Sequence, residues 1–349
     1  MGKILVALSG GLDSAAAAYL LKRDGHDVTG ITFRLTEDAG SVREAAEVAD
    51  RLRIPLLTVD LRETFRREVI GYFAESYLKG ETPAPCTRCN SLVKWKTLLA
   101  QAREGGYAGI ATGHYARITV CDDLFYLTAG ADPVKDQSYY LWDLGQEVLQ
   151  KAVFPLGALR KSEVRSLMAA AGFENLAARP ESMGVCFLKG RSYADFLLSR
   201  FPESGRFANG EIQNKYGKRL GTHTGYPFYT IGQKRGLTLD VPGNHHVISV
   251  DPLHNRLIAG SRADLYMDRL VLKETRIVCP EEFFGSTALE VRIRGVGLNP
   301  HGYCRVRALA GNRLEVLLPE PAFAPAPGQP ALFRIGDRIV GGGWIASAS

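Results

Sequence analysis

Ser9-Gly10-Gly11-Leu12-Asp13-Ser14 lies directly between an apolar run, residues 4–8, and a helix-like run, residues 15–21. Two consecutive glycines let the backbone turn sharply and bring several N–H groups towards one anion, and the following helix presents the positive end of its dipole to the same point. Ser9 and Ser14 add hydroxyl donors. The pattern predicts a phosphate-binding loop, and a purely structural strand-to-helix turn is the alternative.

The glycine spacing excludes two common nucleotide loops. No Gly-Lys-Ser/Thr follows, so this is not a Walker loop, and the spacing does not fit the dinucleotide pattern Gly-x-Gly-x-x-Gly. The motif resembles the pyrophosphatase-type loop of N-type ATP-cleaving enzymes, which bind ATP there and release AMP and pyrophosphate. It therefore predicts a reaction class and leaves the substrate open.

The first part of the chain alternates strand-like and helix-like runs. The strand-like runs are 3–8, 27–33, 55–59 and 109–112, and the helix-like runs are 15–23, 42–52, 65–78 and 92–102. This βαβ alternation predicts an α/β fold with a doubly wound parallel sheet and with ligands at the carboxyl ends of its strands. The glycine-rich loop follows the first of these strands.

The sequence pattern changes after about residue 200, where short apolar runs are separated by Gly, Pro, Asn and Asp. These runs predict β-hairpins and a small β-barrel, and the Pro-rich residues 319–330 predict a loop between late strands. The runs are 247–250, 256–259, 289–294, 303–309, 314–318 and 331–335. We expect a catalytic domain at 1–200, a linking domain at 201–258 and a C-terminal β-barrel at 259–349.

Composition limits the class of protein. The 349 residues are 46% hydrophobic and 23% charged, as in ordinary globular proteins of two or three domains. No apolar stretch approaches the roughly 18 residues of a membrane span, so we expect a cytoplasmic protein that does not bind a membrane. The net charge of +6 would suit a polyanionic partner, or it describes only a slightly basic surface. Six unevenly spaced cysteines indicate reactive thiols or metal ligation rather than a disulfide framework.

Cys86 and Cys89 immediately precede an amphipathic helix that Asn90 or Ser91 could cap. A thiol at a helix N-terminus beside Arg88 should have a lowered pKa, which makes Cys89 a candidate nucleophile. Half of a structural zinc site is the alternative, but no second Cys-x-x-Cys or His pair follows at finger-like spacing.

Cys186 stands between Val185 and Phe187 in residues 181–188, where a buried hydrophobic role is the simplest interpretation. The other three cysteines, Cys121, Cys279 and Cys304, lie in strand-like or hairpin-like contexts and are expected only to pack.

Together these motifs resemble the tRNA-specific 2-thiouridylase family. The resemblance spans nearly the whole chain, in the order of the glycine-rich loop, residues 82–90, 113–117, 135–141, the segment around Cys186, 229–237 and 327–329. Gly-His-Tyr-Ala-Arg followed by Lys-Asp-Gln-Ser-Tyr and the paired cysteines is specific to the family. Such enzymes replace the 2-oxygen of the wobble uridine of certain tRNAs with sulfur.

The resemblance implies an ATP site and two catalytic cysteines. Cys186 would receive sulfur as a persulfide, and Cys89 would help release it and close a disulfide with Cys186 that a reductant reopens. Activation by ATP is needed because an amide-like carbonyl oxygen is a poor leaving group, and Mg²⁺ would neutralise the pyrophosphate. The implied ATP-binding residues are Ala7, Leu8, Ser9, Gly10, Gly11, Leu12, Asp13, Ser14, Phe33 and Gly113.

Cys86 departs from the family, in which many members have an aspartate that is assigned a role beside the target base. A thiol does not inherit the general-base role of a carboxylate. Cys86, Cys89 and Cys186 could instead hold a 4Fe-4S cluster with one iron open to hydrosulfide. The persulfide route is the first interpretation and the cluster route the second.

Recognition of tRNA is expected to be spread along the chain. The implied contacts are Ala84, Pro85, Cys86, His114, Lys135, Asp136, Gln137, Arg294 and Gln329, and basic residues that could meet phosphates are Lys215, Lys218, Arg219, Lys234 and Arg235. The sulfur donor would be a cysteine desulfurase or a sulfur-relay protein. Another ATP pyrophosphatase or tRNA thiolase, or a non-catalytic RNA-binding protein, are the alternatives.

Overall fold

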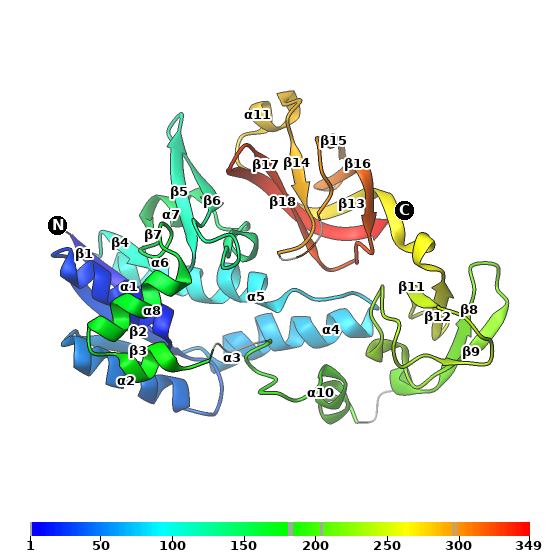
Figure 1. Ribbon diagram of the computed structural model, residues 1–349, viewed down its shortest axis with the longest axis horizontal. Coiled ribbons are helices and arrows are strands. Elements are labelled where there is room, and N and C mark those ends of the chain that lie inside the picture. Colours follow the sequence, from blue (N-terminus) through cyan, green and yellow to red (C-terminus); the bar gives the residue numbers. More distant parts are fainter. Residues whose placement is uncertain (1, 181–183, 203–204, 296, 298) are drawn as a thin grey trace. The chain divides into compact units, whose positions relative to one another are not determined.

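The computed structural model describes residues 2–180, 184–202, 205–295, 297 and 299–349 (Figure 1). Contacts divide the chain into two compact units. The first comprises Met1–Val69, Cys86–Met183 and Gly336–Val340, and the second comprises Ile70–Pro85, Gly184–Ile335 and Gly341–Ser349. The expected division into three domains at residues 200 and 258 stays a prediction.

The first unit contains a five-stranded sheet in the order β3-β2-β1-β4-β7. All four of its strand pairs are parallel, so the predicted doubly wound parallel sheet is confirmed. Because the chain goes from β1 to β2 on one side and reaches β4 on the other, the loops after β1 and β4 diverge at a switch point. The strands are β1 Lys3–Ala7, β2 Asp27–Arg34, β3 Leu56–Asp60, β4 Gly109–Ala111 and β7 Ala152–Val153.

Helix α1 (Leu12–Arg23) packs tightly in the core of the first unit. Its residues Ala15, Ala16, Ala17 and Ala18 are all fully buried. Four small side chains let the helix backbone come close to its neighbours in the core, which include Val6 of β1. The other helices of this unit are α2 Gly40–Leu52, α3 Arg62–Phe65, α5 Pro85–Arg88, α6 Trp95–Glu104, α7 Gln146–Lys151, α8 Lys161–Ala170 and α9 Glu174–Ala178, with the π-helical turns η1 Arg66–Gly71 and η2 Cys89–Lys94 and the 3-10 turn η3 Ser138–Tyr140.

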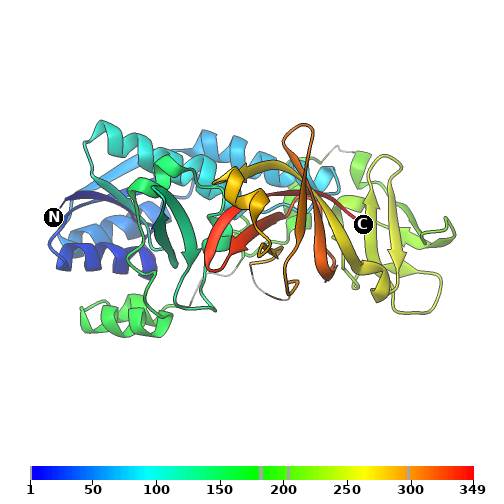
Figure 2. The ribbon, with the colours of Figure 1, turned by 90° about the horizontal axis from the view of Figure 1, so that it is seen from above.

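A β-hairpin interrupts the α/β pattern of the first unit and can be followed in Figures 1 and 2. Strand β5 (Ala116–Cys121) pairs antiparallel with β6 (Leu124–Ala129). Strand β6 also pairs with the beginning of β18 (Arg338–Ala348), through Arg338 and Ile339. The late residues 336–340 therefore belong to the first unit.

The second unit contains two further groups of strands. One is a sheet in the order β10-β9-β8-β12-β11, and the other follows the order β14-β17-β18-β13-β16-β15, so the predicted β-rich C-terminal region is confirmed. The strands are β8 Gly210–Gln213, β9 Arg219–His223, β10 Thr238–Leu239, β11 His246–Asp251, β12 Arg256–Gly260, β13 Tyr266–Ile277, β14 Glu290–Arg292, β15 Arg305–Leu309, β16 Arg313–Phe323 and β17 Pro330–Ile335. Its helices are α4 Tyr72–Leu78, α10 Tyr193–Arg200 and α11 Pro280–Gly285, with 3-10 turns η4 Gly205–Phe207, η5 Tyr226–Phe228 and η6 Arg262–Leu265.

The expectation of a loop over residues 319–330 is wrong in its first part, because β16 continues to Phe323. Its pairing with β13 passes from Leu317 directly to Ala322, with a register shift between them. Pro319 and Pro321 lie in this unpaired stretch, where a proline removes no ladder hydrogen bond. The strand therefore tolerates two prolines that the sequence suggests would end it.

Within the described ranges, no helix combines the length and the apolar character that crossing a membrane requires.

Candidate functional site

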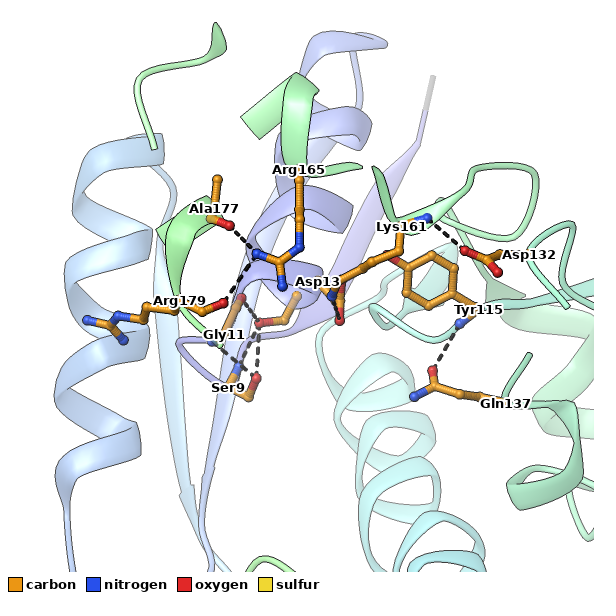
Figure 3. Close-up of polar contacts among 11 residues, drawn as sticks. Ser9, Gly11, Asp13, Tyr115, Asp132, Gln137, Lys161, Arg165, Ala177 and Arg179 are labelled. Atoms are coloured by element: carbon orange, nitrogen blue, oxygen red, sulfur yellow. Dashed lines mark hydrogen bonds and ion pairs between the residues drawn. The ribbon is translucent and has the colours of Figure 1, made fainter. Parts of the chain in front are cut away.

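The loop between β1 and α1 is held by hydrogen bonds among its own residues (Figure 3). The Ser14 hydroxyl donates to the carbonyl of Gly11 at 3.0 Å, and the Ser9 N–H donates to the Ser14 hydroxyl at 3.1 Å. Gly11 caps α1 without a side chain, so the first turn of the helix presents its N–H groups at the loop. Both serines thus fix the curvature of the loop in this structure.

Gly10 cannot be replaced by a residue with a side chain without moving the backbone. Its φ is +78°, and a Cβ there would lie 2.3 Å from Cβ and 2.9 Å from the carbonyl carbon of Glu44 in α2. The tight turn that the two glycines predict is therefore required by the contact with α2.

A cavity of about 150 Å³ lies beside Gly10 on the side of α2 and α9. Glu44 and Glu47 line it together with Arg51 and Arg179, and Arg179 forms an ion pair with Glu44 at 3.0 Å. The cavity therefore presents both signs of charge and no excess of cations for a phosphate.

Asp13 is held by two groups that the sequence analysis did not name as its partners. The Lys161 ammonium lies 2.7 Å from both carboxylate oxygens of Asp13, and the Tyr115 hydroxyl donates to one of them at 2.9 Å (Figure 3). Lys161 is 8% exposed and Tyr115 is 1% exposed. A loop without the lysine of a Walker motif thus receives a buried cation from α8, near the N-terminus of α1.

Lys161 is oriented by the loop between β6 and η3. Its backbone N–H donates to the carboxylate of Asp132 at 2.9 Å, and this hydrogen bond is the main reason why the pKa of Asp132 is lowered. Glu163 closes the start of α8 by accepting from the N–H of Arg160. No local pattern in the sequence separates Lys161 from the other 42 of the 43 lysines and arginines.

Gly113, an expected ATP contact, lies directly against the loop. A Cβ there would be 2.5 Å from the carbonyl carbon and 2.6 Å from the carbonyl oxygen of Asp13. The chain after β4 therefore meets the chain after β1 at the switch point of the sheet. Phe33 is the other expected ATP contact outside residues 7–14. It is 8% exposed and lies on β2, the strand next to β1.

His114 follows Gly113 and is half-buried. Its Nδ1 lies 2.7 Å from the hydroxyl of Thr112, and its ring faces Trp95 with centroids 6.4 Å apart. Burial and, secondarily, the charge of Lys94 lower the pKa of His114 to about 3, so the imidazole is neutral at neutral pH.

The expectation that Cys89 lies at a helix N-terminus is wrong, because the helix begins at Pro85. Proline is favoured at the first helical position, since the N–H it lacks would have no helical partner there. Cys86 lies in this first turn and is exposed, whereas Cys89 is 6% exposed at the start of η2. Asn90 and Ser91 are not caps: their side chains donate to the carbonyls of Tyr140 and Thr87.

Cys186 belongs to the second unit, whereas Cys86 and Cys89 belong to the first. It is exposed, contrary to the buried role that its neighbours suggest. The next residue, Phe187, is 7% exposed and packs edge-on against Phe73 and at a tilt against Phe196, with centroids 5.1 Å and 5.5 Å away. The thiol is thus presented to solvent beside an anchored aromatic side chain, and residues 181–183 of the same motif lie outside the described ranges.

The other three cysteines have structural surroundings. Cys304 is buried, and burial raises the pKa of its thiol to about 12. Cys121 and Cys279 are half-buried and donate to Asp122 and Glu281.

Several expected tRNA contacts use their side chains within the protein. The carboxylate of Asp136 accepts from the N–H groups of Gly130 and Ser138, and the side-chain oxygen of Gln137 accepts from the N–H of Tyr115. In the second unit, Arg294 donates to the carbonyls of Phe323 and Ala324, and Gln329 donates to those of Thr82 and Pro83. These side chains shape the segments that carry them.

The five expected phosphate contacts differ in their surroundings, although all are exposed or nearly so. Lys215 forms an ion pair with Asp264 at 2.7 Å, and Arg219 one with Asp240 at 3.5 Å. Lys234 and Arg235 are exposed in the turn before β10.

The fold and site define a class: an α/β unit with a parallel sheet and a glycine-rich loop after its first strand, combined with a β-rich unit. Residues 2–190 match the family described as tRNA methyl transferase HUP domain, residues 194–261 its PRC-barrel domain, and residues 267–345 the aminomethyltransferase beta-barrel domain.

Curated relatives give the family. A tRNA-specific 2-thiouridylase of Phocaeicola vulgatus is 41% identical over 98% of this chain and 97% of its own length. Others from Bacteroides fragilis and Syntrophotalea carbinolica are 39% and 40% identical, over 99% and 98% of this chain and 94% and 98% of their own lengths. The chain belongs to the tRNA-specific 2-thiouridylase family.

Proposed function

We propose that this protein is a tRNA-uridine 2-sulfurtransferase, which uses ATP to replace the 2-oxygen of a wobble uridine with sulfur. The observation that carries the proposal is identity of about 40% with tRNA-specific 2-thiouridylases over nearly the full length of both chains. The loop from Ser9 to Ser14, with a buried lysine at its carboxylate, supports the ATP-dependent half of the reaction.

ATP would bind at the switch point of the parallel sheet, over residues 7–14, with Phe33 and Gly113 at its borders. The start of α1 and the ammonium of Lys161 supply a positive environment for the phosphates. Asp13 is the carboxylate of this loop that would hold Mg²⁺, a cation that prefers oxygen ligands, in exchange for its contact with Lys161. When bound, Mg²⁺ would neutralise charge on the departing pyrophosphate.

The sulfur chemistry would use Cys186 and Cys89. The terminal sulfur of a Cys186 persulfide attacks C2 of the adenylated uridine, and AMP departs with the original oxygen. The Cys89 thiolate then attacks the Cys186 sulfur, so that the bond between the two persulfide sulfurs breaks, a Cys89–Cys186 disulfide forms and sulfur stays on C2. A thiol reductant reopens the disulfide, and a cysteine desulfurase or sulfur-relay protein restores the persulfide.

A 4Fe-4S cluster on Cys86, Cys89 and Cys186 is the second candidate for the sulfur-transfer step. Cys86 in place of the aspartate of many relatives favours it. The cluster would need cysteines of both units, since Cys86 and Cys89 belong to the first and Cys186 to the second. We place the persulfide route first, and iron analysis of anaerobically purified, active protein decides between the two.

The tRNA would meet both units. We propose that segments 84–86, 114 and 135–137 lie near the anticodon loop, and that the region of Arg294 and Gln329 contacts the stem. Unpaired bases can be turned out of the loop and read directly, which suits chemistry at C2 of one uridine. We propose that the protein acts in the cytoplasm.

The test is thiolation of tRNA by purified protein with ATP, Mg²⁺ and a persulfide donor, read by mass spectrometry of the nucleosides. We expect 2-thiouridine from wild type and from Cys121→Ser, a matched control, and none from Cys186→Ser or Cys89→Ser. Undiminished 2-thiouridine from Cys186→Ser would exclude both sulfur routes. Methylated uridine in place of 2-thiouridine would instead support methyl transfer, the reaction named in the description tRNA methyl transferase HUP domain.

A further inference from the structure

Two hydrogen-bonded routes connect residues 132–137 to Asp13 of the phosphate loop (Figure 3). In the first, the side chain of Gln137 accepts from the Tyr115 N–H at 3.1 Å, and the Tyr115 hydroxyl donates to Asp13 at 2.9 Å. In the second, Asp132 accepts from the Lys161 N–H at 2.9 Å, and the Lys161 ammonium lies 2.7 Å from Asp13. Both routes end on one carboxylate.

Residues 132–137 form a tight unit of their own. The second oxygen of Asp132 accepts from the N–H of Val134 at 3.0 Å, and its backbone carbonyl accepts from Lys135 at 3.1 Å. The carboxylate of Asp136, which is 9% exposed, closes the other end by accepting from Gly130 and Ser138. A displacement of this segment would therefore move Asp132 and Gln137 together.

The intermediate groups are also well packed. Gly130 is in close contact with Tyr115, since a Cβ on Gly130 would lie 2.9 Å from the Tyr115 carbonyl oxygen. The N–H of Gln137 donates to that same carbonyl at 2.9 Å, so Tyr115 is bonded through both its N–H and its C=O to Gln137. Closely packed groups of this kind transmit displacements instead of absorbing them.

Asp13 and Lys161 are the charges that a triphosphate would disturb. Phosphate oxygens compete with the Asp13 carboxylate for the Lys161 ammonium, and Mg²⁺ competes with the ammonium for the carboxylate. The placement of Lys161 and Tyr115 therefore influences how strongly ATP is bound.

We propose that residues 132–137 couple tRNA binding to ATP binding, with Asp132 and Gln137 as positioning residues that act on Asp13 through Lys161 and Tyr115. The inference rests on the proposed function, which places tRNA on residues 135–137. Binding of tRNA there fixes the position of this segment, and both routes pass that position on to Lys161 and Tyr115, so the arrangement at Asp13 that binds ATP is favoured. The coupling is reciprocal: ATP strengthens tRNA binding by the same factor.

The test compares the Kd of a non-hydrolysable ATP analogue with Mg²⁺ in the absence and presence of saturating tRNA. For wild type we expect the Kd of the analogue to be about tenfold lower with tRNA than without it. In Asp132→Asn a single amide oxygen replaces two acceptors for Val134 and Lys161, and Tyr115→Phe keeps the ring but removes the bond to Asp13. Each variant breaks one route and should lower the ratio of the two constants, and the double variant should bring it close to one.

Asp38→Asn is the matched control, because Asp38 also accepts from a backbone N–H, that of Gly40, in the same unit. It should keep the wild-type ratio. A wild-type ratio retained by both Asp132→Asn and Tyr115→Phe would overturn the coupling, as would wild-type protein that binds both ligands independently while still thiolating tRNA. If wild type binds no tRNA and forms no 2-thiouridine, the proposed function fails together with the coupling.

Discussion

The ion pair of Asp13 and Lys161 gives the phosphate loop its electrostatic character. Side-chain exposures of 34% and 11% place the carboxylate at the rim and the ammonium further inside. Removing one member of such a pair leaves the other charge without its compensation, so neither residue is exchangeable alone. The pair also keeps Lys161 extended towards the glycine-rich loop.

We predict that Lys161→Met weakens ATP binding by about tenfold to a hundredfold, because charge-assisted hydrogen bonds to phosphate are lost. Isothermal titration calorimetry with a non-hydrolysable analogue measures the change. Lys96→Met removes an exposed lysine from α6 of the same unit and should bind ATP as wild type does. Equal affinities of Lys161→Met and wild type would show that Lys161 serves only the fold.

A second prediction concerns His114. The folded protein lowers its pKa from 6.5 to about 3, so the unfolded chain takes up the proton first as the pH falls. This contribution to the free energy of unfolding is complete above pH 6.5 and is lost progressively down to about pH 3. NMR of imidazole-labelled protein should show no titration of His114 between pH 8 and about pH 4. A midpoint near 6.5 would contradict the burial of this ring.

At the scale of elements, the turn from Pro327 to Gln329 holds the segment that leads to Cys86 and Cys89. The Gln329 amide donates to the carbonyls of Thr82 and Pro83 at 3.0 and 3.1 Å, and the Thr82 N–H donates to Pro327 at 2.7 Å. Residues 81–84 have no secondary structure of their own, so this turn supplies hydrogen bonds that a helix or strand would otherwise provide.

We predict that Gln329→Met and Gly328→Ala each raise the alkylation rate of buried Cys89 by about tenfold, because the preceding segment opens more often. A Cβ on Gly328 would lie 2.8 Å from the Thr82 carbonyl oxygen, so alanine displaces the segment even with Gln329 in place. Peptide mass spectrometry after timed iodoacetamide treatment measures the rate.

Two controls isolate this effect from general loosening. Gly311→Ala has a similar φ of +74° but meets nothing within 4 Å, so it should leave Cys89 unchanged. Buried Cys304 in the same protein should react at an unaltered rate. Equal acceleration of Cys304 and Cys89 would mean that the variants unfold the second unit instead of releasing one segment.

Local sequence patterns predicted a strand or helix correctly where that element depends on a single run of neighbouring residues. The parallel strands and α1 follow from apolar runs and the loop at Ser9. The start of the helix at Pro85 was missed because Cys-x-x-Cys followed by Asn90 resembles a cap. Lys161 and Tyr115 were missed as partners of Asp13, because long-range contacts leave no signal in the residues adjacent to either of them.

At the scale of the molecule, the net charge of +6 is small, so tRNA binding must depend on which cations face the phosphates. The structure distinguishes cations that form an ion pair within the protein from cations that are exposed in a turn. The pKa of Lys215 is raised mainly by its hydrogen bond to Asp264, which already compensates its charge. Lys234 and Arg235, in contrast, are exposed in a turn.

We predict that Lys234→Gln lowers the slope of log Kd against log salt for tRNA by about one, with weaker binding at low salt. Lys215→Gln should change the slope by clearly less. Fluorescence anisotropy with labelled tRNA over a salt series measures both. Identical slopes for Lys234→Gln and wild type would remove this turn from the tRNA-binding surface.

The contacts of Asp13 also determine how late in synthesis its surroundings can form. Asp13 leaves the ribosome early, but its hydroxyl donor, Tyr115, follows 102 residues later and its cation, Lys161, 148 residues later. Bringing residues so far apart together costs chain entropy, and this entropy is lost before the contacts that compensate for it can form. The nascent chain therefore carries the glycine-rich loop long before Lys161, at the start of α8, is available to pair with Asp13.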